Sequence, residues 1–125
     1  MSPADRYGLR QVEAPVVDLD EFLPRQGLPR VGILKIDAEG WDLEVLKGAE
    51  RTAAEADVVL RGAMVMCPHF ENRLGHVISE MDRRDFVPFD STDLIRTARH
   101  EALWMVEIAF VKRDGPLHSA VDRYD

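Results

Sequence analysis

Residues 34–50 read LKIDAEGWDLEVLKGAE, and this stretch contains the change of period that decides the fold. The overlapping run VGILKI, residues 31–36, is short and mostly apolar, as is typical of a parallel strand buried on both faces. After Gly40 the apolar residues recur at helical spacing. Gly48 is unfavourable inside a helix, which predicts that one short helix ends there and another begins at Ala49. We therefore expect a strand, a tight turn and two short helices.

The rest of the chain continues the alternation of strands and helices. A mostly apolar run at 57–66 predicts a second strand, and residues 74–81 show the i, i+3, i+4, i+7 spacing of an amphipathic helix. Further strands are expected at 86–89 and at 103–111, with a polar loop at 91–102 between them. The last strand is apolar on both faces and is therefore expected to be central. This order predicts an α/β fold, a parallel sheet with flanking helices, and permits an antiparallel final pair.

The sequence predicts a single domain between two terminal segments. Residues 1–11 are polar, lack a period, and are expected to form a flexible lead-in. Residues 12–113 form the expected domain, and residues 114–125 a C-terminal tail. Trp104 falls at strand spacing and is expected in the core.

The composition narrows the possible partners and compartment. The 125 residues include 16 Lys and Arg and 23 Asp and Glu, a net charge of −7 that argues against nucleic-acid binding. No apolar run approaches the roughly 20 residues of a membrane span, and the N-terminus lacks a signal-peptide core. The single cysteine, Cys67, cannot form an internal disulfide and predicts no metal site with its neighbours. A cytoplasmic protein without a membrane partner is therefore expected.

Two carboxylates follow the first strand at its carboxyl end, where open α/β sheets bind ligands. Asp37 and Glu39 have the chemistry to accept hydrogen bonds, to act as a general base or to bind a cation. Gly40 allows a tight turn into the helix. The alternative is that Glu39 and Asp42 only stabilise the helix N-terminus, where negative charge is favoured. His69, after the second strand, is either a further base or a surface histidine.

The segment ILKIDAEGWDLEVLKGAE resembles the signature of FkbM-type S-adenosylmethionine-dependent methyltransferases, in which LKID-x-EG precedes an E-x-L-x-G-A helix. The segments VEAPVVDLDEFL, DFVPFDS and LWMVEIAFVKR also resemble parts of that family, so the resemblance covers about residues 12–113. It implies a Rossmann-like methyltransferase sheet of order 3-2-1-4-5-7-6, of which this chain would supply strands 4, 5, 7 and 6. Strand 7 is antiparallel in that sheet. The family mostly methylates hydroxyl oxygens of small molecules, sugars and natural products.

The resemblance also implies roles for individual residues. Asp37 is the expected catalytic or substrate-orienting carboxylate, and Glu39 is its catalytic neighbour. Asp37 and Gly40 are expected at the methyl donor, S-adenosylmethionine. The expected substrate-binding residues are Lys35, Trp41 and His69.

The chain also departs from the family pattern. It contains no G-x-G triplet, so the glycine-rich turn that approaches the donor is absent, as is the acidic residue that binds the ribose hydroxyls. Arg61 stands near where the family often has a glutamate, and Trp41 replaces a usually small residue. We therefore expect these residues to supply the substrate side of a methyl-transfer site and not its donor side.

Two other functions fit the same residues. The chain could be an inactive, truncated remnant that acts in assembly, with the bared edge of 31–36 pairing with another copy or with its own 12–17. It could also be a magnesium-dependent phosphoryl-transfer protein with Asp37, Glu39 and Asp42 as ligands. The methyltransferase, acting on a small molecule, is the first of the three hypotheses.

Overall fold

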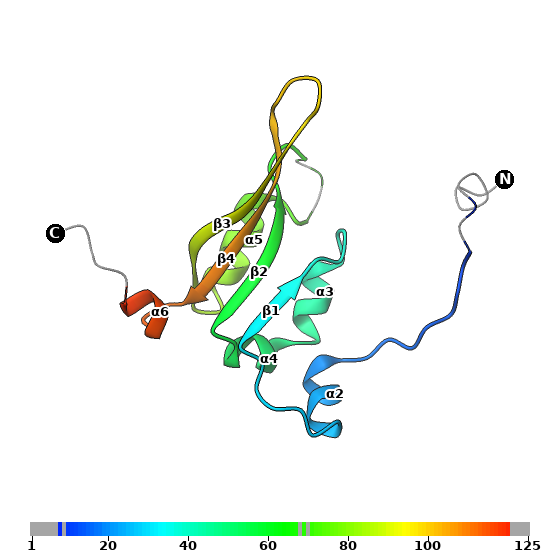
Figure 1. The fold of residues 1–125 in the computed structure, drawn as a ribbon, viewed down its shortest axis with the longest axis vertical. Helices are drawn as coiled ribbons and strands as arrows, with labels where there is room; N and C mark the ends of the chain where they lie inside the picture. The colour runs from blue at the N-terminus through cyan, green and yellow to red at the C-terminus, as the bar shows by residue number, and fades with distance from the viewer. Residues whose placement is uncertain (1–7, 9, 68, 70, 121–125) are drawn as a thin grey trace.

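A four-stranded open sheet with helices packed on one face forms the body of the molecule (Figure 1). The computed structural model describes residues 8, 10–67, 69 and 71–120. The strands are β1 Ile33–Ile36, β2 Val58–Met64, β3 Phe86–Arg96 and β4 Leu103–Lys112. The helices are α2 Leu19–Arg25, α3 Asp42–Lys47, α4 Glu50–Glu55, α5 Leu74–Asp82 and α6 Pro116–Ser119.

The strand order in the sheet is β1-β2-β4-β3. β1 and β2 are parallel, whereas β4 is antiparallel to both of its neighbours. The α/β class, the flanking helices, the central place of the last strand and its antiparallel direction are thereby confirmed. The break at Gly48 is confirmed as well, because this residue ends α3 and α4 begins just after Ala49.

The helix-covered face of the sheet holds the core. Leu34 of β1, Val59 of β2 and Phe110 of β4 lie in register side by side, and all three are buried. Helix residues close over them: Leu46 from α3, Ala53 from α4, and Val77 and Met81 from α5. Fully burying a side chain of this size contributes about 1.5–3 kcal/mol, so this layer stabilises the fold that positions the site.

The opposite face of β1 is open, which corrects the prediction that 31–36 is buried on both faces. Exposure alternates along β1, and Ile33 is 62% exposed. Within the described residues the other edge of β1 is unpaired, because residues 12–17 run extended in solvent instead of joining the sheet (Figure 1). Pairing of 31–36 with the chain's own 12–17 was therefore wrong, and pairing with another copy stays a prediction.

The β3–β4 hairpin is longer than the sequence predicted. β3 runs to Arg96 instead of ending at 89, so half of the expected loop at 91–102 is strand. Its side chains are mostly exposed, but the backbone pairs with β4 through several register shifts. Main-chain pairing needs no apolar side chains, so the hydrophobic pattern did not reveal it. The tip of this hairpin projects beyond the rest of the sheet in Figure 1.

Candidate functional site

A tight turn of residues 37–40 carries the chain from β1 into α3. The Trp41 N–H donates to the Ala38 carbonyl oxygen over 3.1 Å and closes the turn. Glu39 has a φ of 48° and Gly40 a φ of 105°, so two successive residues adopt left-handed backbone conformations. Glycine does so without strain, but for a residue such as Glu39 the conformation costs of order 1 kcal/mol. Both carboxylates of the turn, Asp37 and Glu39, are exposed.

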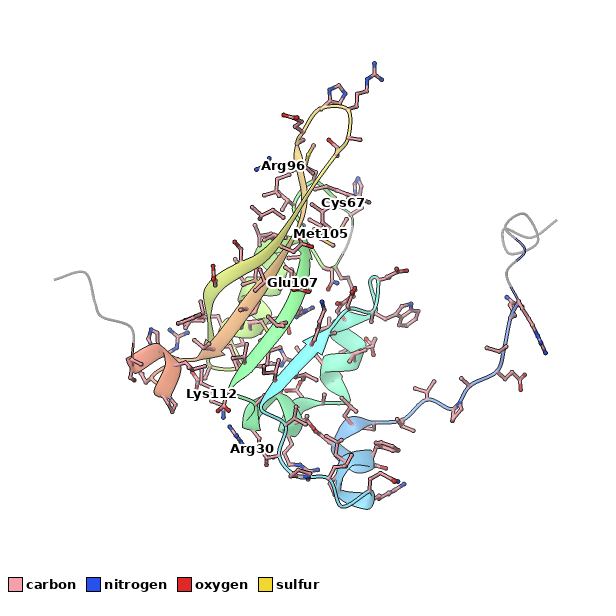
Figure 2. The ribbon with its side chains drawn as sticks, viewed as in Figure 1. Arg30, Cys67, Arg96, Met105, Glu107 and Lys112 are labelled. Carbon is pink, nitrogen blue, oxygen red and sulfur yellow. The ribbon has the colours of Figure 1, made fainter. Side chains whose placement is uncertain are left out.

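A cavity of about 430 Å³ lies beside this turn. Its walls come from four segments of the chain: Asp37, Glu39, Gly40 and Asp42; Gly62, Ala63 and Met64; Asn72; and Trp104 and Met105. Figure 2 labels Met105 on β4, near the end of β2 that follows Gly62. The volume lies within the range of about 300–1,000 Å³ found for small-molecule sites.

A buried chain of hydrogen bonds fixes the back of the turn. The carboxylate of Asp42 is buried, and its Oδ2 accepts hydrogen bonds from the Gly40 N–H (3.1 Å) and from Asn72 Nδ2 (2.7 Å). Asn72 Oδ1 accepts from Arg61 Nη2 over 3.0 Å. The Asn72 carbonyl oxygen accepts from the Met64 N–H over 2.7 Å. The turn after β1 is thus tied to the end of β2. Asp42, suggested from the sequence as a helix cap, stabilises the turn instead.

Arg61 is the most unusual member of this chain, because its side chain is only 1% exposed. Burial lowers the pKa of its guanidinium, and the nearby carboxylate of Asp42 opposes that shift. Arginine nevertheless stays protonated in proteins. Within the described residues, its Nε and Nη1 groups have no hydrogen-bond partner.

A second polar cluster lies on the open face of the sheet. Lys35 Nζ lies 2.9 Å from Glu107 Oε2, and Thr92 Oγ1 donates to Glu107 Oε1 over 2.8 Å. These hydrogen bonds, from Lys35 first and Thr92 second, hold the pKa of Glu107 below its ordinary value. The same ion pair raises the pKa of Lys35. Glu107 is labelled in Figure 2, along β4 from Met105.

The structure brings together some of the predicted site residues and separates others. Asp37, Glu39 and Gly40 line one cavity, as their sequence proximity suggested. Trp41 is 70% exposed and lines a different groove of about 450 Å³, beside Val45 of α3. Two further predicted substrate-binding residues lie outside the wall of the Asp37 cavity: Lys35, which pairs with Glu107, and His69, which is exposed.

Several lining residues were missed by the sequence analysis. Trp104 was expected in the core, but it is 44% exposed, lines the cavity, and its Nε1 donates to Cys67 Sγ over 3.3 Å. Met105 reaches the cavity because it pairs with Met64 in the β2–β4 register. Asn72 lies in a loop and carried no sequence signal.

The charge of the cavity limits what it can bind. Its wall includes the carboxylates of Asp37, Glu39 and Asp42, and it includes no Lys, Arg or His among the described residues. Such a wall favours neutral hydroxyl donors and cations, and it disfavours phosphates and carboxylates. Across the described part of the chain, no group of three His, Cys, Asp or Glu side chains is placed to hold a metal ion.

Residues 2–88 match a family model described as a methyltransferase FkbM domain. The matched region contains the turn at 37–40 and ends within β3, before β4 begins. No curated protein and no solved structure gives a significant match. None of the helices in the described ranges is long and apolar enough to cross a membrane.

Proposed function

The chain belongs to the FkbM methyltransferase family, and from that premise we propose that it supplies the acceptor side of a methyl-transfer site. The observation that carries the proposal is the cavity at the end of β1, because it gathers Asp37, Glu39 and Gly40 of the family-like signature. The strand order and the antiparallel β4 support assigning the sheet as strands 4, 5, 7 and 6 of a Rossmann-like methyltransferase. The proposed acceptor is a hydroxyl group of a small molecule or sugar.

The proposed roles follow from the chemistry of the wall. Asp37 orients the acceptor hydroxyl and takes up its proton, while Glu39 accepts a second hydrogen bond from the same molecule. Trp104 and Met105 contact the apolar part of the acceptor. Lys35, Trp41 and His69 are left out of the proposed acceptor site, because they do not line this cavity.

S-adenosylmethionine would supply the methyl group when bound. The carboxylates of Asp37 and Glu39 suit the positive charges of its sulfonium and amino groups, and Gly40 leaves its side of the turn open to close approach. The chain offers no glycine-rich turn for the adenosine part of the donor. These residues thus fit the methionine end of the donor and not its nucleoside.

Calorimetry with S-adenosylmethionine, followed by methyl transfer to a panel of neutral polyhydroxy compounds, tests the proposal. The wild-type chain is expected to bind the donor, and Asp37→Asn to lower the rate of transfer by at least about a hundredfold, as loss of a general base does. Glu44→Gln is the matched control, because Glu44 is an exposed carboxylate on α3 that does not line the cavity. A wild-type chain that neither binds the donor nor transfers a methyl group would refute the proposal.

A second candidate function, assembly, is favoured by the unpaired edge of β1. An exposed strand edge is a template for pairing with another chain, and Ile33 adds an exposed apolar side chain there. We expect a second copy to pair along 31–36. Native mass spectrometry of the wild-type chain and of Ile33→Pro tests this. The Val58 N–H donates to the Gly32 carbonyl oxygen, so in this parallel register the N–H of Ile33 faces the free edge, and proline removes that donor. A wild-type monomer at all concentrations contradicts the expectation.

A further inference from the structure

The buried guanidinium of Arg61 is costly to the fold and is not explained by packing. Taking an arginine out of water with its Nε and Nη1 nitrogens unpaired, as they are among the described residues, costs several kcal/mol before any compensation. Its compensation comes from one side only, through Asn72 and the carboxylate of Asp42. A residue kept at such a cost is expected to have a role in what it holds.

We propose that Arg61 is a positioning residue for the turn 37–40, acting through Asn72 and Asp42. The importance of this turn for catalysis rests on the proposed function above. The positioning itself does not, because it concerns only the backbone of this chain.

The direction of each hydrogen bond carries the inference. A guanidinium has only donors, so the Asn72 amide must present its oxygen to Arg61. Its Nδ2 group is then turned toward Asp42, over 2.7 Å. Asp42 is held so that the same oxygen also accepts from the Gly40 N–H. Without Arg61, the Asn72 oxygen would lose its buried donor, and Asp42 alone would hold the amide in this orientation.

The turn needs such support because its backbone is strained. Glu39 occupies the left-handed region without being glycine, and such conformations persist only where the surroundings determine them. The Gly40 N–H bond to Asp42 and the Trp41 N–H bond to Ala38 are the hydrogen bonds that hold it among the described residues. The bond from Gly40 to Asp42 is the last in the series of hydrogen bonds that begins at Arg61. Arg61 thus fixes the carboxylates at the cavity indirectly, through the side chains of Asn72 and Asp42.

Amide hydrogen exchange followed by NMR tests the inference on the chain without any ligand. In Arg61→Met, the Gly40 amide is expected to exchange about tenfold faster relative to the core amide of Val59, a loss of local stability of about 1.4 kcal/mol. Asn72→Ala interrupts the same chain one bond later and should give the same change. Arg61→Lys keeps one donor and should restore part of the protection.

Arg30→Met is the control. Arg30 pairs with Asp57 over 2.5 Å, so its loss removes an ion pair without touching the turn or Arg61. The ratio of Gly40 to Val59 exchange is expected to stay unchanged in this variant. Equal acceleration of both amides in Arg61→Met and in Asn72→Ala would overturn the inference, because it would show global destabilisation only. An absence of methyl transfer by the wild-type chain would refute the proposed function and leave this result standing.

Discussion

The two faces of the sheet hold polar clusters that differ in almost every physical respect. On the covered face, Arg61 and Asp42 are 1% and 3% exposed and are joined through Asn72. On the open face, Lys35 and Glu107 form a direct ion pair whose lysine is largely exposed. Buried charges interact strongly but pay for desolvation, whereas exposed pairs are screened by water and salt.

The difference indicates which cluster can hold geometry. An ion pair that water can separate at little cost does not hold neighbouring residues in one position. We therefore assign no positioning role to the Lys35–Glu107 pair. The covered cluster lies between the turn 37–40 and β2, and any rearrangement there would leave a buried charge unpaired. The geometry of the site is therefore expected to depend on this covered cluster, and through it on Arg61, which does not line the cavity.

The largest expected effect is a difference in stability between substitutions on the two faces of the sheet. Phe110→Ala on the covered face should lower the free energy of unfolding by about 3–5 kcal/mol, because it leaves a cavity in the core. Ile33→Ala on the open face should change it by no more than about 0.5 kcal/mol. Urea denaturation measures both. A large loss in Ile33→Ala would show that another copy or another protein segment covers the open face in solution.

The next effect concerns the energetic coupling between Arg61 and Asp42 in the covered cluster. Asp42→Ala leaves the Arg61 charge without its neighbouring carboxylate and should cost about 3 kcal/mol. Adding Arg61→Met to it should recover part of that loss, since an apolar replacement of a buried pair is often nearly neutral. A double-mutant cycle by urea denaturation gives the coupling. Strictly additive losses would mean that the two residues do not interact.

The smallest effect concerns pH and the open-face pair. Because the pKa of Glu107 is lower in the folded chain than its ordinary value of 4.5, its contribution to stability is complete above that value. The contribution is lost as the pH falls through the lower, folded pKa. The raised pKa of Lys35 acts at the other end: its contribution is complete below 10.5 and is lost as the pH rises through the folded value.

Urea midpoints between pH 3 and pH 7 test the acidic side of this prediction. Wild type should lose more stability on acidification than Glu107→Gln, and high salt should narrow the gap. Identical pH profiles for the two chains would show that the ion pair does not form in solution.

Much of the fold could be read from local pattern. The strand at 31–36, the turn at 37–40 and the helix break at Gly48 follow from residue types a few positions apart, so the sequence contains the whole signal. The antiparallel last strand followed from the lack of a helix before it. The longer β3 could not be read in the same way, because main-chain pairing with β4 forms that strand while most of its side chains stay exposed.

The candidate site likewise contains residues that the sequence predicted and residues that only the tertiary structure revealed. Asp37, Glu39 and Gly40 are adjacent in the chain, and the sequence alone determined that they stand together at the end of a strand. Only the tertiary structure decided what faces them. Trp104 and Met105 reach the cavity through the register of β4 on β2, and Arg61 reaches Gly40 through two intervening side chains. Such contacts depend on how distant segments pack, which no pattern of neighbouring residues specifies.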